Sequence, residues 1–201
     1  MALIKLNNRS VKDATAFGSI SSLGELNFIS KQTASSSATI SFTSGIDSTY
    51  KEYIFYFVNI HPATDDTLFQ FNLSTDGGSN YNVTKTTTIF RAIHNESDSE
   101  AVLQYRTDAD LAQSTGFQTL AERVGADNDQ SNNGYLHLFN PSDTTFVKHF
   151  KSRFAECNAI DYMQDSFIAG YGNTTSAVNA VQFKMASGNI DSGDIILFGL
   201  N

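Results

Sequence analysis

Cysteine is nearly absent from this sequence, and so are long apolar runs. Cys157 is the only cysteine among 201 residues, so no intramolecular disulfide can form, and a small secreted domain stapled by disulfides is excluded. No segment approaches the roughly 18 apolar residues that a helix needs to span a bilayer. The apolar start, residues 1–6, is too short for a signal peptide. We therefore expect no membrane insertion, a fold held by packing, and a protein that stays in the cytoplasm where it is made or leaves by cell lysis.

Basic residues are outnumbered, and tryptophan is missing. Lys and Arg total 13 against 21 Asp and Glu, which gives a formal net charge of -8. Such a surface repels phosphate backbones and anionic headgroups, so nucleic acid is not an expected partner. Charged residues make up only 17% of the chain, whereas 16 Phe and 8 Tyr supply large side chains for a core. This composition is typical of β structure, in which aromatic and β-branched residues are enriched.

Short runs that alternate apolar and polar residues recur along the chain. Alternation with period two places one set of side chains on a buried face and the other toward water, as in a half-buried antiparallel strand. The predicted strands are residues 38–42, 52–60, 67–73, 83–93, 100–105, 134–139, 145–150, 167–171, 178–185 and 194–200. About ten such strands predict an all-β fold, an antiparallel β-sandwich that is jelly-roll-like. Residues 108–124 break the alternation and are expected to hold at most a turn or two of helix.

The first 30 residues differ in charge from the remainder. Lys5, Arg9 and Lys12 make this segment locally basic on an acidic protein. We expect a docking arm over residues 1–30 and a single β-sandwich domain over residues 31–201. The alternative is that the segment is simply the first edge strand and a loop. The candidate partner contacts of the arm are Leu3, Ile4, Lys5, Leu6 and Arg9.

The ionisable residues form no motif that dictates a reaction, so no catalytic residue, metal site or cofactor is predicted. A hairpin turn at Asn140 and Pro141 would place His137 opposite residue 147 or 148 and near His149, but two histidines without a third ligand are a weak zinc signal. Asp127, Asp129 and Ser131 are spaced like calcium ligands. The positions that an EF-hand fills with Gly and Glu hold Asn132 and Leu138, so the EF-hand motif fails. A calcium ion bound in this loop by Asp127 and Asp129 stays an alternative to a solvated turn.

Exposed aromatic residues beside Asn-rich and Asp-rich loops suggest a different site. A sugar-binding site needs a flat ring to stack on a pyranose, together with amides or carboxylates that bond its hydroxyls. The candidate glycan or receptor contacts are Tyr105, Asp127, Asp129, Asn132 and Tyr162. The absence of Trp weakens this hypothesis, and core packing is the alternative role for the tyrosines.

Several stretches resemble proteins of marine tailed bacteriophages. The opening MALIKLNNRSV resembles a start shared by a set of such proteins. The body resembles uncharacterised virion proteins of these phages in ISKQTASSS (29–37), DGGSNY (76–81), GYLHLFNP (134–141) and ASGNIDSG (186–193). The similarity spans almost the whole chain, but these motifs are strand and turn patterns that carry no site.

The resemblance implies a non-enzymatic structural protein on the exterior of the virion, assembled in the host cytoplasm. Its start would dock on other virion proteins, of the capsid or the tail. One role is a tail-fibre-type domain that forms a homo-oligomer such as a trimer and contacts a host surface glycan. The other is a decoration protein that clamps capsid subunits. A more remote alternative is a glycan-cleaving enzyme, for which the acidic cluster to test is Glu96, Glu100, Asp108 and Asp110.

Overall fold

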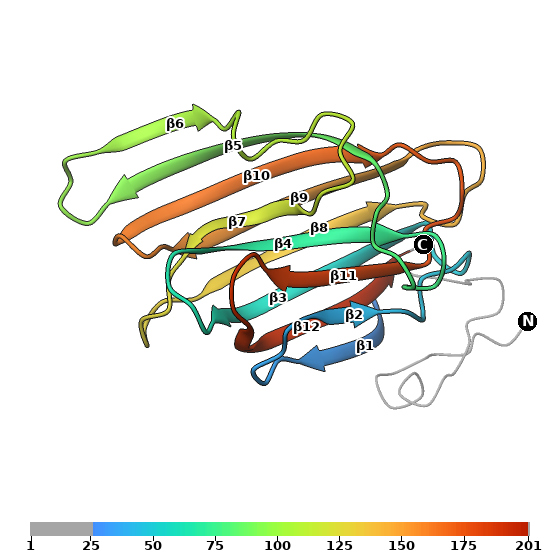
Figure 1. Cartoon of the computed structure of the whole chain (residues 1–201), viewed down its shortest axis with the longest axis horizontal. Helices are drawn as coiled ribbons and strands as arrows, with labels where there is room; N and C mark the ends of the chain where they lie inside the picture. Colours follow the sequence, from blue (N-terminus) through green and yellow to red (C-terminus); the bar gives the residue numbers. More distant parts are fainter. Residues whose placement is uncertain (1–25, 201) are drawn as a thin grey trace, which may run out of the picture.

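The computed structural model describes residues 26–200, which form β-strands and no helix (Figure 1). The strands are β1 (Asn27–Thr33), β2 (Ile40–Phe42), β3 (Glu52–Pro62), β4 (Thr67–Ser74), β5 (Lys85–Asn95), β6 (Ala101–Tyr105), β7 (Gln118–Val124), β8 (Asn132–Phe139), β9 (Lys148–Cys157), β10 (Tyr162–Gly172), β11 (Ala180–Met185) and β12 (Ile190–Leu200). The predicted all-β class is confirmed. This part of the chain contains no helix long and apolar enough to cross a membrane.

The candidate docking arm falls largely outside the described residues. Its contact residues Leu3, Ile4, Lys5, Leu6 and Arg9 all lie there. Strand β1 crosses the expected boundary at residue 30 and pairs with β12 at one edge of a sheet.

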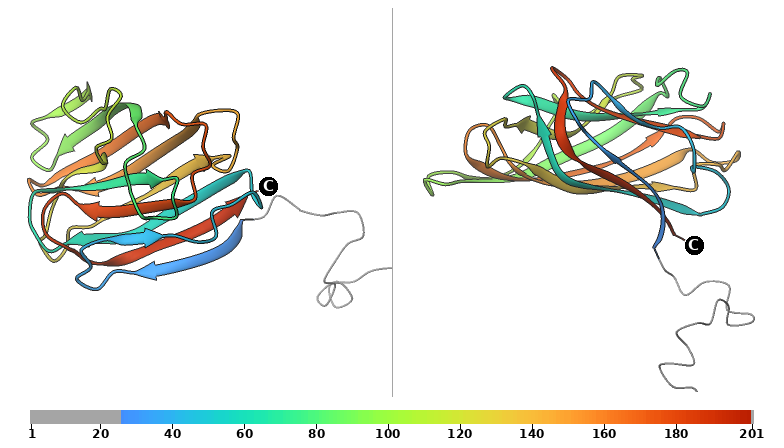
Figure 2. Two further views of the ribbon diagram at one scale, coloured as in Figure 1. Left: turned by 45° about the vertical axis from the view of Figure 1, so that its right-hand side comes forward. Right: turned by 90° about the horizontal axis from the view of Figure 1, so that it is seen from below.

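The strands form two antiparallel sheets of unequal width that lie one over the other (Figures 1 and 2). The larger sheet has eight strands in the order β1-β12-β3-β8-β9-β10-β5-β6. The smaller sheet has four strands in the order β2-β11-β4-β7. Because four strands cannot cover eight, β6 lies beyond the smaller sheet and all five of its residues are exposed.

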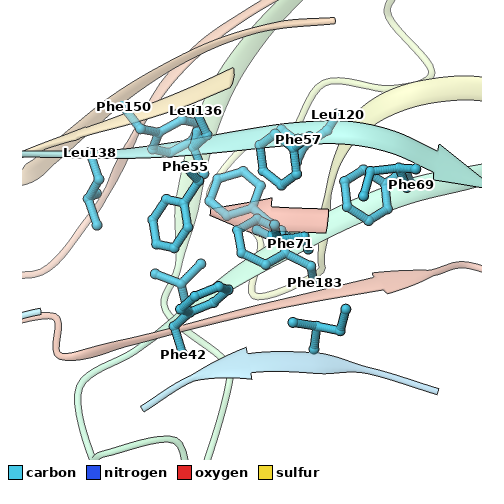
Figure 3. Close-up of a cluster of buried hydrophobic side chains, with 14 of the residues drawn as sticks. Phe42, Phe55, Phe57, Phe69, Phe71, Leu120, Leu136, Leu138, Phe150 and Phe183 are labelled. Atoms are coloured by element: carbon cyan, nitrogen blue, oxygen red, sulfur yellow. The ribbon is translucent and has the colours of Figure 1, made fainter. Parts of the chain in front are cut away.

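A cluster of phenylalanines fills the space between the sheets (Figure 3). Phe183 of β11 is fully buried, and its ring lies 5.1 Å from Phe57 and 5.2 Å from Phe55 of the opposite sheet. Rings of its own sheet, Phe69 and Phe71, stack beside it at 6.1 and 6.4 Å. The alternate residues of the larger sheet point the other way, as period two requires. That second face is called the outer face below.

The helical turn expected within residues 108–124 is wrong, because Gln118–Val124 is strand β7. Every residue of β7 except Arg123 is buried, and a strand buried on both faces shows no alternation. Its Glu122 lies in a buried polar cluster, where Glu122 Oε1 is 3.0 Å from the Arg106 guanidinium. The Glu122 backbone N–H donates to the buried Glu156 carboxylate of β9 at 3.0 Å. Burial raises the pKa of Glu156 well above its usual value.

Candidate functional site

The outer face of the larger sheet carries a row of large side chains that cross five strands. Strand register places Phe90, Phe167, Arg153, Tyr135 and Tyr56 side by side on β5, β10, β9, β8 and β3. These five residues are called the aromatic row. The row follows from alternation, because each of its members lies one residue away from a buried position on its own strand.

Contacts within the aromatic row hold its side chains in place. The Phe90 and Phe167 rings stack in parallel, with centroids 4.8 Å apart and an interplanar angle of 5°. The Arg153 guanidinium lies 4.7 Å from the centroid of the Phe167 ring, within the range of a cation–π contact. Two Arg153 nitrogens donate to the Asp165 carboxylate at 2.6 and 2.9 Å, and this pairing raises the pKa of Arg153. The row is therefore a preorganised apolar wall with a fixed cation.

A second row, in which two of the side chains are short, lies beside the aromatic row. Register makes Thr88, Ala169, Lys151 and His137 neighbours on β5, β10, β9 and β8. Since Thr88 and Ala169 are short, they form the floor of a hollow of about 380 Å³. The first hollow is lined by Thr88, Phe90, Tyr135, His137, Phe139, Lys151, Ser152, Arg153, Phe167, Ile168 and Ala169. Its volume lies within the range of small-ligand sites in proteins.

A second hollow of about 270 Å³ adjoins the first. Its far side is formed by Tyr171 and His149, whose rings lie 6.1 Å apart. The two hollows share the lining residues Thr88, Phe139, Lys151 and Ala169. Together they make one extended open site, which suits a chain-like ligand better than a compact one.

The candidate tyrosines lie on different parts of the larger sheet. Tyr105 is 49% exposed and lies next to Phe90 in register, so it extends the aromatic row onto β6. Its hydroxyl donates to Asp110 at 2.6 Å, and this bond raises the pKa of the phenol. Tyr162 begins β10 and donates to Glu100 at 2.8 Å, which raises its pKa in the same way. Only Tyr105 belongs to the outer-face row.

The candidate contacts in and beside the loop do not lie next to the candidate tyrosines. Asn132 is fully buried and donates from Nδ2 to the Ile60 carbonyl at 3.1 Å. It is therefore inaccessible to a glycan, and the hypothesis that it contacts one is wrong for this structure. Asp127 and Asp129 remain at the surface in the loop between β7 and β8. Three strands separate β8 from β6, so Asn132 and Tyr105 are roughly 19 Å apart across the sheet at the usual strand spacing.

The expected histidine register is also wrong. His137 pairs with Lys151 rather than with residue 147 or 148, because β9 begins only at Lys148 after a long irregular turn. His137 Nδ1 contacts the Glu52 carboxylate instead. Among residues 26–200, no three His, Cys, Asp or Glu side chains are grouped so that they could hold a metal ion.

Three of the four candidate acidic residues have partners of their own. Glu100 and Asp110 accept the tyrosine hydroxyls described above, and Asp108 accepts from Arg106 at 2.8 Å. Asp108 and Asp110 follow β6, whereas Glu96 lies in the turn before it. The carboxylates of Glu100, Asp108 and Asp110 are thus already bonded to neighbouring side chains.

Neither a scan against protein-family models nor a search of curated proteins finds a match to this chain. The assignment of a function therefore rests on the residues themselves. Sequence reasoning missed most of the outer-face site, since Phe90 comes from β5, far along the chain from the β9 and β10 strands that supply Lys151, Arg153 and Phe167. Alternation could have marked Phe90 and Phe167 as outward-facing, but only the register shows that the four residues are neighbours.

Proposed function

We propose that this chain is a non-enzymatic structural protein of a tailed-phage virion, and that it binds a host surface glycan through the outer face of its larger sheet. The observation that carries the binding role is the pair of adjoining hollows beside the aromatic row. Apolar walls pack against the C–H groups of a sugar, while polar side chains such as Thr88 and His137 are placed to bond hydroxyls. The virion setting rests on the resemblance described above.

The side chains that line the site support binding rather than catalysis. The basic and histidine side chains that line the two hollows are His137, His149, Lys151 and Arg153. A glycosidase of the usual kind needs two facing carboxyl groups about 5 to 10 Å apart. Neither hollow has an acidic residue in its described lining.

The binding role is tested by filling the floor shared by the hollows. We expect Ala169→Tyr to weaken glycan binding about tenfold or more, because the new ring occupies the space between Phe167 and Tyr171. The measurement is binding to an array of neutral and acidic bacterial-type glycans. The matched control is Ala63→Tyr, an exposed alanine in the turn between β3 and β4 that lines neither hollow.

The control variant should bind as the unaltered protein does. A thermal melt shows whether Ala169→Tyr is folded, and Phe167→Ala provides a second variant that removes a wall instead of adding bulk. Unchanged binding in both hollow variants, or no binding of any glycan by the unaltered protein, would contradict the proposal.

Docking through the N-terminal segment is the second part of the proposal. It is supported by the local basic charge of Lys5, Arg9 and Lys12 on an acidic protein. Deleting residues 2–13 is expected to leave a folded domain that no longer joins particles, as measured by mass spectrometry of purified virions. Incorporation of the truncated protein at the normal level would refute the docking role. The same measurement gives the copy number, and a fixed large fraction of the capsid subunits would indicate head decoration instead of a tail appendage.

We also propose that the domain forms a homo-oligomer through β6. This strand has an unpaired edge at the end of the larger sheet and carries the exposed apolar residues Leu103 (74%) and Val102 (40%). An uncharged, flat edge strand pairs readily with another strand. The opposite edge strand, β1, is blunted by a register shift and by Lys31.

A further inference from the structure

The charged side chains that line the two hollows are opposite in sign to the net charge of the protein. The chain carries a net charge of -8. Yet the described lining of the hollows contains the cations Lys151 and Arg153 and the histidines His137 and His149, and no Asp or Glu. A hollow that concentrates positive groups on an acidic protein attracts an anionic ligand locally while the remaining surface repels anions.

Lys151 is the cation in this set that is left for a ligand. Arg153 is held by Asp165 through two hydrogen bonds, and His137 contacts Glu52. The Lys151 side chain is exposed, lies between Ala169 and His137 in register, and lines both hollows. Its ammonium group makes no hydrogen bond or ion pair with any residue of the described part of the chain.

We infer that the ligand of this face is an acidic glycan, and that an anionic group of it binds the Lys151 ammonium where the two hollows meet. This inference rests on the proposed glycan-binding function and specifies its ligand class. Sugar units on either side of the anionic group occupy the two hollows, with the aromatic row along one side and Tyr171 along the other. The hydrogen bond from the Lys151 ammonium to the anionic group is charge-assisted and hence stronger than a bond to a neutral hydroxyl. An ammonium is a point donor without the fork of arginine, so it can donate to a carboxylate or to a sulfate.

The test uses matched pairs of glycans that differ in charge alone. Oligogalacturonate is compared with its methyl ester, and a sulfated galactan oligosaccharide with its desulfated form, within the same array that tests the proposed function. We expect the acidic member of a pair to bind and its neutral partner to bind at least about tenfold more weakly, which is the usual worth of a hydrogen bond to a charged group. The pair that shows this difference identifies a carboxylate or a sulfate as the anionic group.

Substitution of the lysine assigns the effect to this position. Lys151→Gln should weaken binding of acidic glycans about tenfold or more, and the remaining affinity should depend less on salt concentration. Lys151→Arg should retain most of the affinity for acidic glycans. The control is Lys31→Gln, which removes the same charge from β1 at the far edge of the same sheet, where Lys31 pairs with Asp194.

Each outcome has a distinct meaning. Equal binding of neutral and acidic partners, or unchanged binding by Lys151→Gln, would overturn this inference while leaving the glycan-binding function in place. Binding of no array member by the unaltered protein would overturn both. Loss of binding in the Lys31→Gln control to the same extent as in Lys151→Gln would show that overall charge, and not the hollow, is responsible, and would likewise overturn the inference.

Discussion

Replacing Phe183 with alanine is expected to lower the free energy of unfolding by about 3 to 5 kcal/mol, which is the range for truncating a buried phenylalanine. The side chain is fully buried at the centre of the core. Its ring lies next to rings of both sheets, Phe55 and Phe57 on one side and Phe69 and Phe71 on the other. Its loss opens a cavity where the two layers meet.

The measurement is urea unfolding followed by circular dichroism, with a matched substitution elsewhere. Phe146→Ala removes the same ring from a turn where it is 69% exposed, and should change stability by no more than about 0.5 kcal/mol. A similar loss in both variants would show that the core does not depend on the contact between the layers. A domain of marginal stability could unfold outright in Phe183→Ala, which would be seen as loss of the native signal without denaturant.

Alternation predicted most strands because in those strands apolar residues mark the buried face directly. In β3, the buried Phe55 and Phe57 flank the outward-facing Tyr56. Prediction from alternation failed in strands whose buried positions are polar. The inward positions of β9 include Lys148, Ser152 and Glu156, so only the first part of this ten-residue strand was predicted. Such groups are buried only with partners, and the partners come from distant segments that a single strand does not reveal.

The candidate site was predictable only in part for a similar reason. Tyr105 was correctly placed among exposed aromatics, and it extends the aromatic row. The hollow itself depends on short side chains such as Ala169 and Thr88 that lie between long ones on neighbouring strands. A sequence shows which residues are short, but the space above them exists only once the register has aligned them.

Stability is expected to rise with pH between 7 and 9 because of one buried lysine. Lys85 of β5 is fully buried, and burial lowers its pKa from 10.5 to about 7. In this range the unfolded chain keeps the proton while the folded protein loses it. Folding therefore releases a proton, and the free energy of unfolding rises with pH, by about 2 kcal/mol over these two units from this group alone. Below pH 7 the folded protein holds a buried charged ammonium, which lowers the free energy of unfolding.

The experiment compares urea unfolding at pH 7 and pH 9 for the unaltered protein and for Lys85→Met. Methionine cannot titrate, so the variant should lose the rise. The control Lys31→Met, at an exposed edge position, should keep it. The neutral amine suits the site, because it can still donate one hydrogen to the Val83 carbonyl at 2.8 Å and another to the Asn72 side chain. A rise that persists in Lys85→Met would mean that Lys85 keeps its proton in the folded protein, despite a location that gives it neutral oxygens and no carboxylate to bond.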